Sequence, residues 1–146
     1  MDLHPIARTS FPSLTDYLAW DHDEIMKLLR VARTAEAFEA LRTRLARHIR
    51  IEEEALFPRF EAAMGVTTRG PTFAMSLEHI EIGKLLEEMS QALAAGDAGA
   101  FADDHAELEQ LLVRHHAWEE GSFSPWMDQL AGDQIGSLVD WIERQP

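Results

Sequence analysis

Cysteine is absent from this 146-residue chain, and basic residues are scarce. Without cysteine the chain has no disulfides, thiolate metal ligands or cysteine nucleophiles, so any metal site must use nitrogen and oxygen atoms. Lys and Arg number 13 against 26 Asp and Glu, which gives a formal net charge of −13. This charge argues against binding to nucleic-acid phosphates or to anionic membranes, and it suits a cationic partner better.

Long hydrophobic runs are also missing. No stretch approaches about 18 consecutive apolar residues, which a membrane-spanning helix would need. The first 13 residues contain neither a basic start followed by an apolar run nor a cleavage-like motif of small residues. We therefore expect a cytoplasmic protein. Its apolar content of 46% is sufficient for one hydrophobic core.

Apolar residues recur with the helical period along the chain, and no run of β-branched residues alternates convincingly, so we expect an all-α fold. The predicted architecture is an antiparallel up-and-down four-helix bundle over residues 13–132, with a short fifth helix over residues 133–146 packed on the same domain. Glycines at positions 65, 96 and 132 suit the ends of helices. The four long helices are expected over residues 13–31, 35–64, 72–95 and 97–131.

An internal repeat relates the two halves of the chain. The segment DHDEIMKLL (Asp21 to Leu29) reappears as EHIEIGKLL (Glu78 to Leu86). Likewise RHIRIEEEALFP (Arg47 to Pro58) aligns without gaps on RHHAWEEGSFSP (Arg114 to Pro125). Two similar helical hairpins that each carry an apolar face bury it by packing on each other, which predicts a pseudo-twofold bundle.

Polar residues of the repeat lie on the apolar faces of the predicted helices. At 100° per residue, positions i, i+4, i+7 and i+11 stay on one side of a helix, and the repeated histidines and glutamates share these positions with leucines and isoleucines. Six ionisable side chains are therefore expected inside the bundle: His22, His48, Glu52, His79, His115 and Glu119.

A cluster of buried histidines and carboxylates predicts a metal site. An unpaired buried carboxylate costs several kcal/mol, so the two glutamates need a common cationic partner. A histidine and a glutamate four residues apart lie one helical turn apart and can bind the same ion or adjacent ions. Imidazole and carboxylate together favour iron, manganese or zinc over calcium or magnesium. Two divalent ions carry four positive charges, which two carboxylates and a bridging hydroxide largely offset, so the charge count favours two ions.

Neighbouring polar residues receive other interpretations. His116 and Glu120 share the four-residue spacing, but they lie off the leucine face and have no counterpart in the first half, so we expect them around the site or facing solvent. Glu53 and Glu54 are expected on a solvated acidic face, from which one carboxylate can reach the metal. Acid-to-arginine pairs between neighbouring helices are expected around the histidines, from Asp21, Glu78, Arg47 and Arg114. Two further histidines lie outside the repeated pattern: His4 and His105.

These motifs resemble the hemerythrin-like family of HHE cation-binding domains, from about Asp16 to Gly132. The resemblance implies a four-helix bundle with a non-haem di-iron centre that is bridged by an oxo or hydroxo group, with zinc or manganese as alternative metals. It implies terminal ligands His22, His48, His79 and His115, and bridging carboxylates Glu52 and Glu119.

The chain departs from the oxygen carriers of that family at two positions. Their third helix supplies two histidines one turn apart, whereas here Met75 and Gly83 flank His79. Their last bridging carboxylate is an aspartate five residues after the histidine, whereas Glu119 follows His115 by four. Six protein ligands and an oxygen bridge would leave both ions about five-coordinate, so small ligands could approach either ion.

The resemblance implies a protein that binds oxygen, nitric oxide or a small anion for sensing, storage or detoxification. A di-iron oxidase or peroxidase, an iron-handling or iron-centre repair protein, a zinc hydrolase and a purely structural bundle stay open. No Gly-rich phosphate loop or Ser/His/Asp arrangement is evident, which makes an enzyme the weaker interpretation. The cysteine-bearing module of some repair proteins is missing from the sequence. We expect neither nucleic-acid nor membrane partners, and a homodimer stays open.

Overall fold

The computed structural model describes residues 11–66 and 70–146. His4 and residues 67–69, which belong to the loop expected between the second and third predicted helices, lie outside the described residues. The described ranges are helical and contain no strand, which confirms the all-α prediction. They divide into two compact units. We call residues 24–115 the central unit, and residues 11–23 together with 116–146 the terminal unit.

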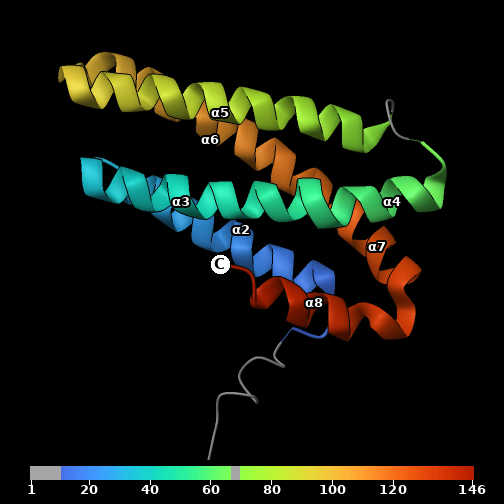
Figure 1. The fold of residues 1–146 in the computed structure, drawn as a ribbon. Coiled ribbons are helices and arrows are strands. Elements are labelled where there is room, and N and C mark those ends of the chain that lie inside the picture. Colours follow the sequence, from blue (N-terminus) through green and yellow to red (C-terminus); the bar gives the residue numbers. More distant parts are fainter. Residues whose placement is uncertain (1–10, 67–69) are drawn as a thin grey trace, which may run out of the picture. The chain divides into compact units, whose positions relative to one another are not determined.

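The helices follow the predicted order (Figure 1). A π-helical turn interrupts two of them. The first predicted helix is α2 (Leu14–Val31) and the third is α5 (Pro71–Ala95). The second consists of α3 (Ala35–Ile51), the π turn η1 (Glu52–Leu56) and α4 (Phe57–Met64). The fourth consists of α6 (Ala98–Trp118), the π turn η2 (Glu119–Phe123) and α7 (Ser124–Ala131). A 3₁₀ turn, η3 (Gly132–Gln134), leads to α8 (Ile135–Glu143).

Capping residues explain where the helices begin and end. Thr34 accepts a hydrogen bond from the backbone N–H of Ala37, and Asp97 does the same for Ala100, so side chains satisfy amides at the starts of α3 and α6. Gly65 and Gly96 have φ values of 73° and 70°, in the left-handed region that glycine adopts without a steric penalty. These two glycines stand where the sequence predicted helix ends.

The central unit is a four-helix bundle around one apolar core. Side chains from α2, α3, α5 and α6 form a continuous buried cluster, with Ile25, Leu45, Met89 and Leu108 at or near zero exposure. The turns after α2 and α5 span only a few residues, so the helices within each hairpin run antiparallel. His105 is buried in this unit, and its Nε2 donates a hydrogen bond to the Leu29 carbonyl at 2.8 Å. It is therefore a satisfied core residue.

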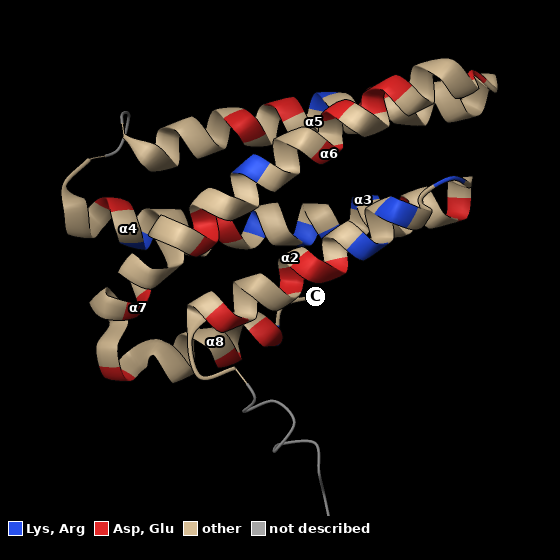
Figure 2. Cartoon of the chain, turned by 180° about the vertical axis from the view of Figure 1, so that it is seen from behind, with Lys and Arg blue, Asp and Glu red and all other residues tan. Residues whose placement is uncertain are grey.

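Charge is unevenly distributed over the central unit. Figure 2 shows basic residues on α3 and mainly acidic residues on α5 and α6. Arg42 of α3 lies 3.7 Å from Glu87 of α5, and both side chains are accessible to solvent, Arg42 partly and Glu87 largely. Exposed pairs of this kind contribute about 0–1 kcal/mol, so packing of the apolar core and not ion pairing holds these helices together.

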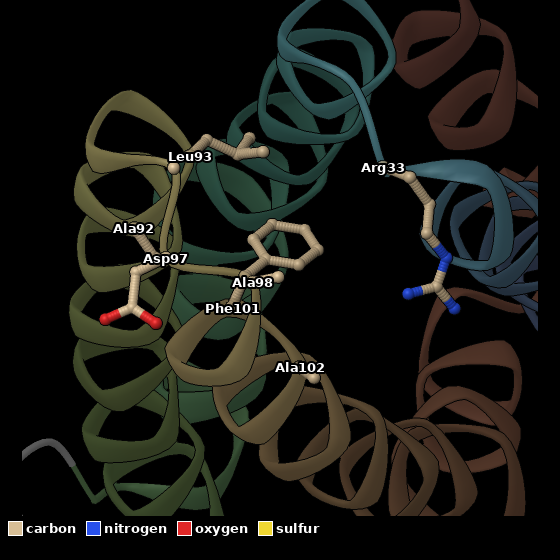
Figure 3. A pocket seen from close by; sticks show the side chains of 8 residues that line it. Arg33, Ala92, Leu93, Asp97, Ala98, Phe101 and Ala102 are labelled. Carbon is tan, nitrogen blue, oxygen red and sulfur yellow. The ribbon is translucent and has the colours of Figure 1, made fainter.

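A pocket of about 250 Å³ lies beside the turn between α5 and α6 in the central unit. Its apolar wall includes Leu93 and Phe101, and the guanidinium of Arg33 extends toward it from the opposite side (Figure 3). Asp97 also lines the pocket, and its carboxylate serves as the cap of α6. The lining contains no histidine or glutamate, so this pocket is separate from the predicted metal ligands.

The terminal unit fixes the start of α2 against α7. The Asp128 carboxylate accepts hydrogen bonds from the backbone N–H groups of Leu14, at 2.7 Å, and Thr15, at 3.1 Å, and from the Thr15 hydroxyl at 2.6 Å. A carboxylate at a helix N-terminus satisfies amides that the helix itself leaves unbonded, and it also interacts favourably with the helix dipole.

Among the described helices, none combines the length and the apolar character that a membrane crossing requires.

Candidate metal centre

All six predicted ligands are buried, with exposed fractions between 0 and 7%. Four belong to the central unit and two to the terminal unit. The central-unit set consists of His48 on α3, Glu52 at the start of η1, His79 on α5 and His115 on α6. The terminal-unit set consists of His22 on α2 and Glu119 at the start of η2.

The four central-unit side chains converge on the Glu52 carboxylate. His79 Nε2 lies 3.0 Å from Glu52 Oε1 and 3.2 Å from His115 Nε2. His115 Nε2 lies 3.9 Å from the same Oε1, and His48 Nε2 lies 2.9 Å from Glu52 Oε2. Glu52, His79 and His115 thus offer donor atoms close enough to bind a common ion.

Two outer carboxylates determine which nitrogen of each imidazole carries the proton. His79 Nδ1 lies 2.6 Å from Glu53 Oε2, and His115 Nδ1 lies 2.7 Å from Glu78 Oε1. A carboxylate only accepts, so both Nδ1 atoms are donors, and in the neutral imidazole Nε2 then presents a lone pair. Such carboxylate partners of metal-binding histidines orient the ring and increase its basicity.

The chemistry of this donor set fits a metal cation. Nε2 of His79 lies close to Nε2 of His115 and to a carboxylate oxygen of Glu52 inside a buried space. With Nδ1 protonated, neutral imidazoles present lone pairs at these Nε2 atoms, and a cation would bind the two lone pairs and the carboxylate oxygen together. Nitrogen and oxygen donors together suit iron, manganese or zinc. The buried histidines and glutamates therefore suit a metal-ion centre.

The terminal unit repeats the same arrangement. His22 Nε2 lies 2.8 Å from Glu119 Oε1, while His22 Nδ1 lies 2.7 Å from Glu120 Oε2. In the internal repeat His22 corresponds to His79, and Glu119 and Glu120 correspond to Glu52 and Glu53. In both units, one imidazole is held between two successive glutamates, the first at Nε2 and the second at Nδ1.

The π turns explain how two successive glutamates contact one ring. Pro58 and Pro125 follow the π turns, and proline has no N–H to donate and clashes with the carbonyl four residues earlier in a regular α-helix. The helix widens instead, and the N–H groups of Phe57 and Ser124 bond to the carbonyls of Glu52 and Glu119, five residues back. The Ser124 hydroxyl also donates to the Glu119 carbonyl, at 2.9 Å. Single π turns in long helices occur frequently at functional sites.

Several neighbours of the predicted ligands differ from the sequence-based interpretation. Glu53 and Glu120 contact imidazoles directly, and the signal for this was the pair of adjacent glutamates that recurs in register in both halves. Glu78 contacts His115 and not an arginine, because Arg114 donates to the Gln110 carbonyl at 3.5 Å. The expectation of acid-to-arginine pairing is wrong for these two residues.

The structure buries His116 against the ring of His22. The two ring centroids are 3.8 Å apart and the planes differ by 7°, and His116 is 6% exposed. The alternative that His116 faces solvent is therefore wrong, and its place is beside the predicted ligands.

Met75, which replaces a histidine of the oxygen carriers, is buried on α5 one turn before His79.

Comparisons with known proteins agree with this chemistry. The family model described as the hemerythrin HHE cation binding domain matches residues 4–127. Over 57 residues the chain is 37% identical to the iron-sulfur cluster repair protein YtfE of Yersinia pseudotuberculosis serotype IB (strain PB1/+). That similarity covers 39% of this chain and 26% of the relative, so the chain spans about a quarter of the relative's length. No solved structure matches the chain.

Proposed function

We propose, because this chain belongs to the hemerythrin HHE cation-binding domain family, that it is a non-haem di-iron protein that binds oxygen or a related small ligand. The proposed ligands are the six residues of the repeat. Glu52 and Glu119 bridge the two ions, and the terminal ligands are His22, His48, His79 and His115.

The observation that carries this proposal is the position of one imidazole between two successive glutamates in each unit. A fully buried glutamate lies at Nε2, and a partly exposed glutamate lies at Nδ1. A buried carboxylate beside a ring nitrogen offers the oxygen and nitrogen donors that iron binds, and an outer carboxylate at the other nitrogen orients the ring for that role. The arrangement occurs in both units, which supports two ions.

Small-ligand binding is supported by the number of protein ligands. Six residues, two of them bridging, leave the ions short of six-coordination, and iron held by nitrogen and oxygen donors with open positions binds small ligands. The proposed ligands are oxygen, nitric oxide or a small anion, used for sensing, storage or detoxification.

The chain's net charge of −13 makes nucleic acid an unfavourable partner for it.

The test measures the absorption spectrum of the iron-loaded protein at controlled oxygen concentrations. Apo-protein is loaded with ferrous iron without oxygen and then exposed to it, and we expect ligand-to-metal charge-transfer absorption to develop and to decline when oxygen is removed. Glu54→Gln is the control variant, because Glu54 is exposed and should leave the spectrum unchanged. Iron-loaded protein that stays colourless with two irons bound would contradict small-ligand binding.

Repair of iron-sulfur clusters is a second candidate, and the similarity to a named cluster-repair protein favours it. Iron-loaded chain is mixed with a purified protein whose [4Fe–4S] cluster has been depleted of iron by oxidation. Recovery of cluster absorbance that depends on the iron-loaded chain, beyond the recovery with an equal amount of free ferrous iron, would support repair. Reversible oxygen binding without such recovery would support the first candidate.

A further inference from the structure

We propose that His116 makes the two ions of the centre inequivalent, because it stacks on the His22 ligand ring with a polar imidazole, more closely than the phenyl ring of Phe57 stacks on His79. His116 is a positioning residue that acts through His22. This inference rests on the proposed function, because it takes the central-unit residues and the terminal-unit residues as ligand sets for two ions.

The internal repeat shows where the symmetry is broken. His22 and His79 correspond to each other, and each is held between two successive glutamates at nearly equal distances. The residue that corresponds to His116 in the first half is Ile49, which has no ring to stack. The residue that corresponds to Phe57 in the second half is Ser124. The two glutamate contacts of each imidazole are thus alike, and the rings that cover the imidazoles differ.

The two covering rings differ in chemistry and in distance. His116 lies parallel to His22 with the centroids 3.8 Å apart. Phe57 lies parallel to His79 with the centroids 5.6 Å apart, so this stack is offset. An imidazole has a large in-plane dipole and polar nitrogens, whereas a phenyl ring is apolar with only a quadrupole. The electron density at His22 Nε2 is therefore set by a different field from that at His79 Nε2.

The stacked geometry argues against His116 as another ligand of the ion that His22 would bind. A metal ion lies near the plane of the imidazole that binds it, at about 2.0–2.1 Å from the nitrogen in the case of zinc. Two parallel rings in van der Waals contact have planes roughly 3.5 Å apart. An ion in the plane of His22 is too far from the plane of His116 for a normal bond. The close stack therefore fixes the His22 ring and polarises it without adding a ligand.

The experiment compares the two irons by Mössbauer spectroscopy of protein loaded with ferrous ⁵⁷Fe in the absence of oxygen. Wild type is expected to give two quadrupole doublets of equal area. In His116→Phe both ligand rings are covered by phenyl groups, and the difference between the two splittings is expected to fall by at least about half. His105→Gln is the control, because His105 is also buried but contacts the Leu29 carbonyl, and Gln can still donate there.

The outcomes separate this inference from the proposed function. Fewer than two irons per wild-type chain would contradict the di-iron proposal itself. Two irons with the same pair of doublets in wild type and in folded His116→Phe would overturn the role of His116 and leave the di-iron centre standing. If His116→Phe does not fold, as judged by the thermal unfolding of the apo-protein, His116→Gln removes the ring, and an unchanged pair of doublets there would overturn the inference equally.

Discussion

At the scale of single residues, two neighbouring glutamates contact opposite nitrogens of one imidazole. Glu52 is fully buried at Nε2 of His79, while Glu53 is 37% exposed at Nδ1 of the same ring. The buried carboxylate lies at Nε2, where the neutral ring has its lone pair, and the half-buried carboxylate accepts a hydrogen bond from Nδ1–H. The first is therefore suited to bind a cation directly, and the second to orient the ring. The same division holds for Glu119 and Glu120 around His22.

Replacement of a buried glutamate should remove metal from the protein. In Glu52→Gln and Glu119→Gln a neutral amide replaces a bridging carboxylate, so we expect iron content to fall from two ions per chain to one or fewer. Glu54→Gln is the matched control, since Glu54 is exposed and lies two residues after Glu52. Elemental analysis of purified protein measures the effect. Equal iron content in all three variants would show that the buried glutamates are not ligands.

Replacement of an outer glutamate should weaken metal binding without removing a ligand. In Glu53→Ala the Nδ1 proton of His79 loses its acceptor, and we expect metal affinity to decrease about 10- to 100-fold while two ions still bind at saturation. Competition with a chromophoric chelator measures the affinity, and Glu54→Ala is the control. An affinity that is the same in the two variants would mean that Glu53 does not orient the ligand.

The sequence predicted the inward-facing residues better than their partners. Spacings of four and seven residues identified the six candidate ligands, and the structure buries all of them; their binding of metal stays a prediction. The sequence analysis left open whether Glu53 and Glu120 face solvent or the site, because at 100° per residue a neighbour of an inward residue points away from the interior. The burial of His116 was underestimated for the same reason, since it directly follows the inward-facing His115.

At the scale of secondary-structure elements, the boundaries of the four long helices were predictable and the π turns were not. Glycines and capping residues mark the ends of helices in the sequence, and the structure uses Thr34, Gly65 and Gly96 in these ways. A π turn shifts the register by about one residue, which a periodicity averaged over a whole helix does not show. The available signal was a proline six residues after each inward glutamate, which ends normal α-helical bonding.

The π turns should matter more for metal binding than for stability. In a Pro58→Ala, Pro125→Ala double variant, both positions regain an N–H and a regular α-helix becomes favourable. We expect the apo-protein to unfold at the wild-type temperature or higher, and metal affinity to fall by about tenfold or more, because Glu52 and Glu53 would no longer contact the same ring. Thermal unfolding and chelator competition measure the two effects. Wild-type affinity together with a regular helix in a crystal structure would contradict this role for the turns.

At the scale of the whole molecule, each of the two units buries ionisable groups among apolar side chains. The central unit contains a continuous apolar core as well as His48, Glu52, His79 and His115. The terminal unit buries His22, His116 and Glu119. Buried polar groups that lack a cation destabilise a folded chain, and a ligand that binds only the folded state stabilises it by mass action.

Metal should therefore raise the stability of the folded chain. With iron or zinc at about 100 times the dissociation constant, binding to the native state alone contributes roughly 2.7 kcal/mol per site. We expect iron-loaded protein to unfold at a clearly higher temperature than apo-protein near neutral pH, by several degrees for a chain of this size. Glu52→Gln should show a smaller increase. Coincident unfolding temperatures of apo and loaded wild type would mean that the buried histidines and glutamates do not bind metal.

Anomalous diffraction at the iron edge, from crystals of the iron-loaded protein, tests the di-iron centre most directly. We predict two anomalous peaks per chain, roughly 3.5–4 Å apart as in other two-metal sites. One peak should be in bonding contact with Nε2 of both His79 and His115 and with a Glu52 oxygen, and the other with Nε2 of His22. A single peak, or peaks bound by exposed carboxylates away from these residues, would contradict the assignment of this chain as a di-iron protein.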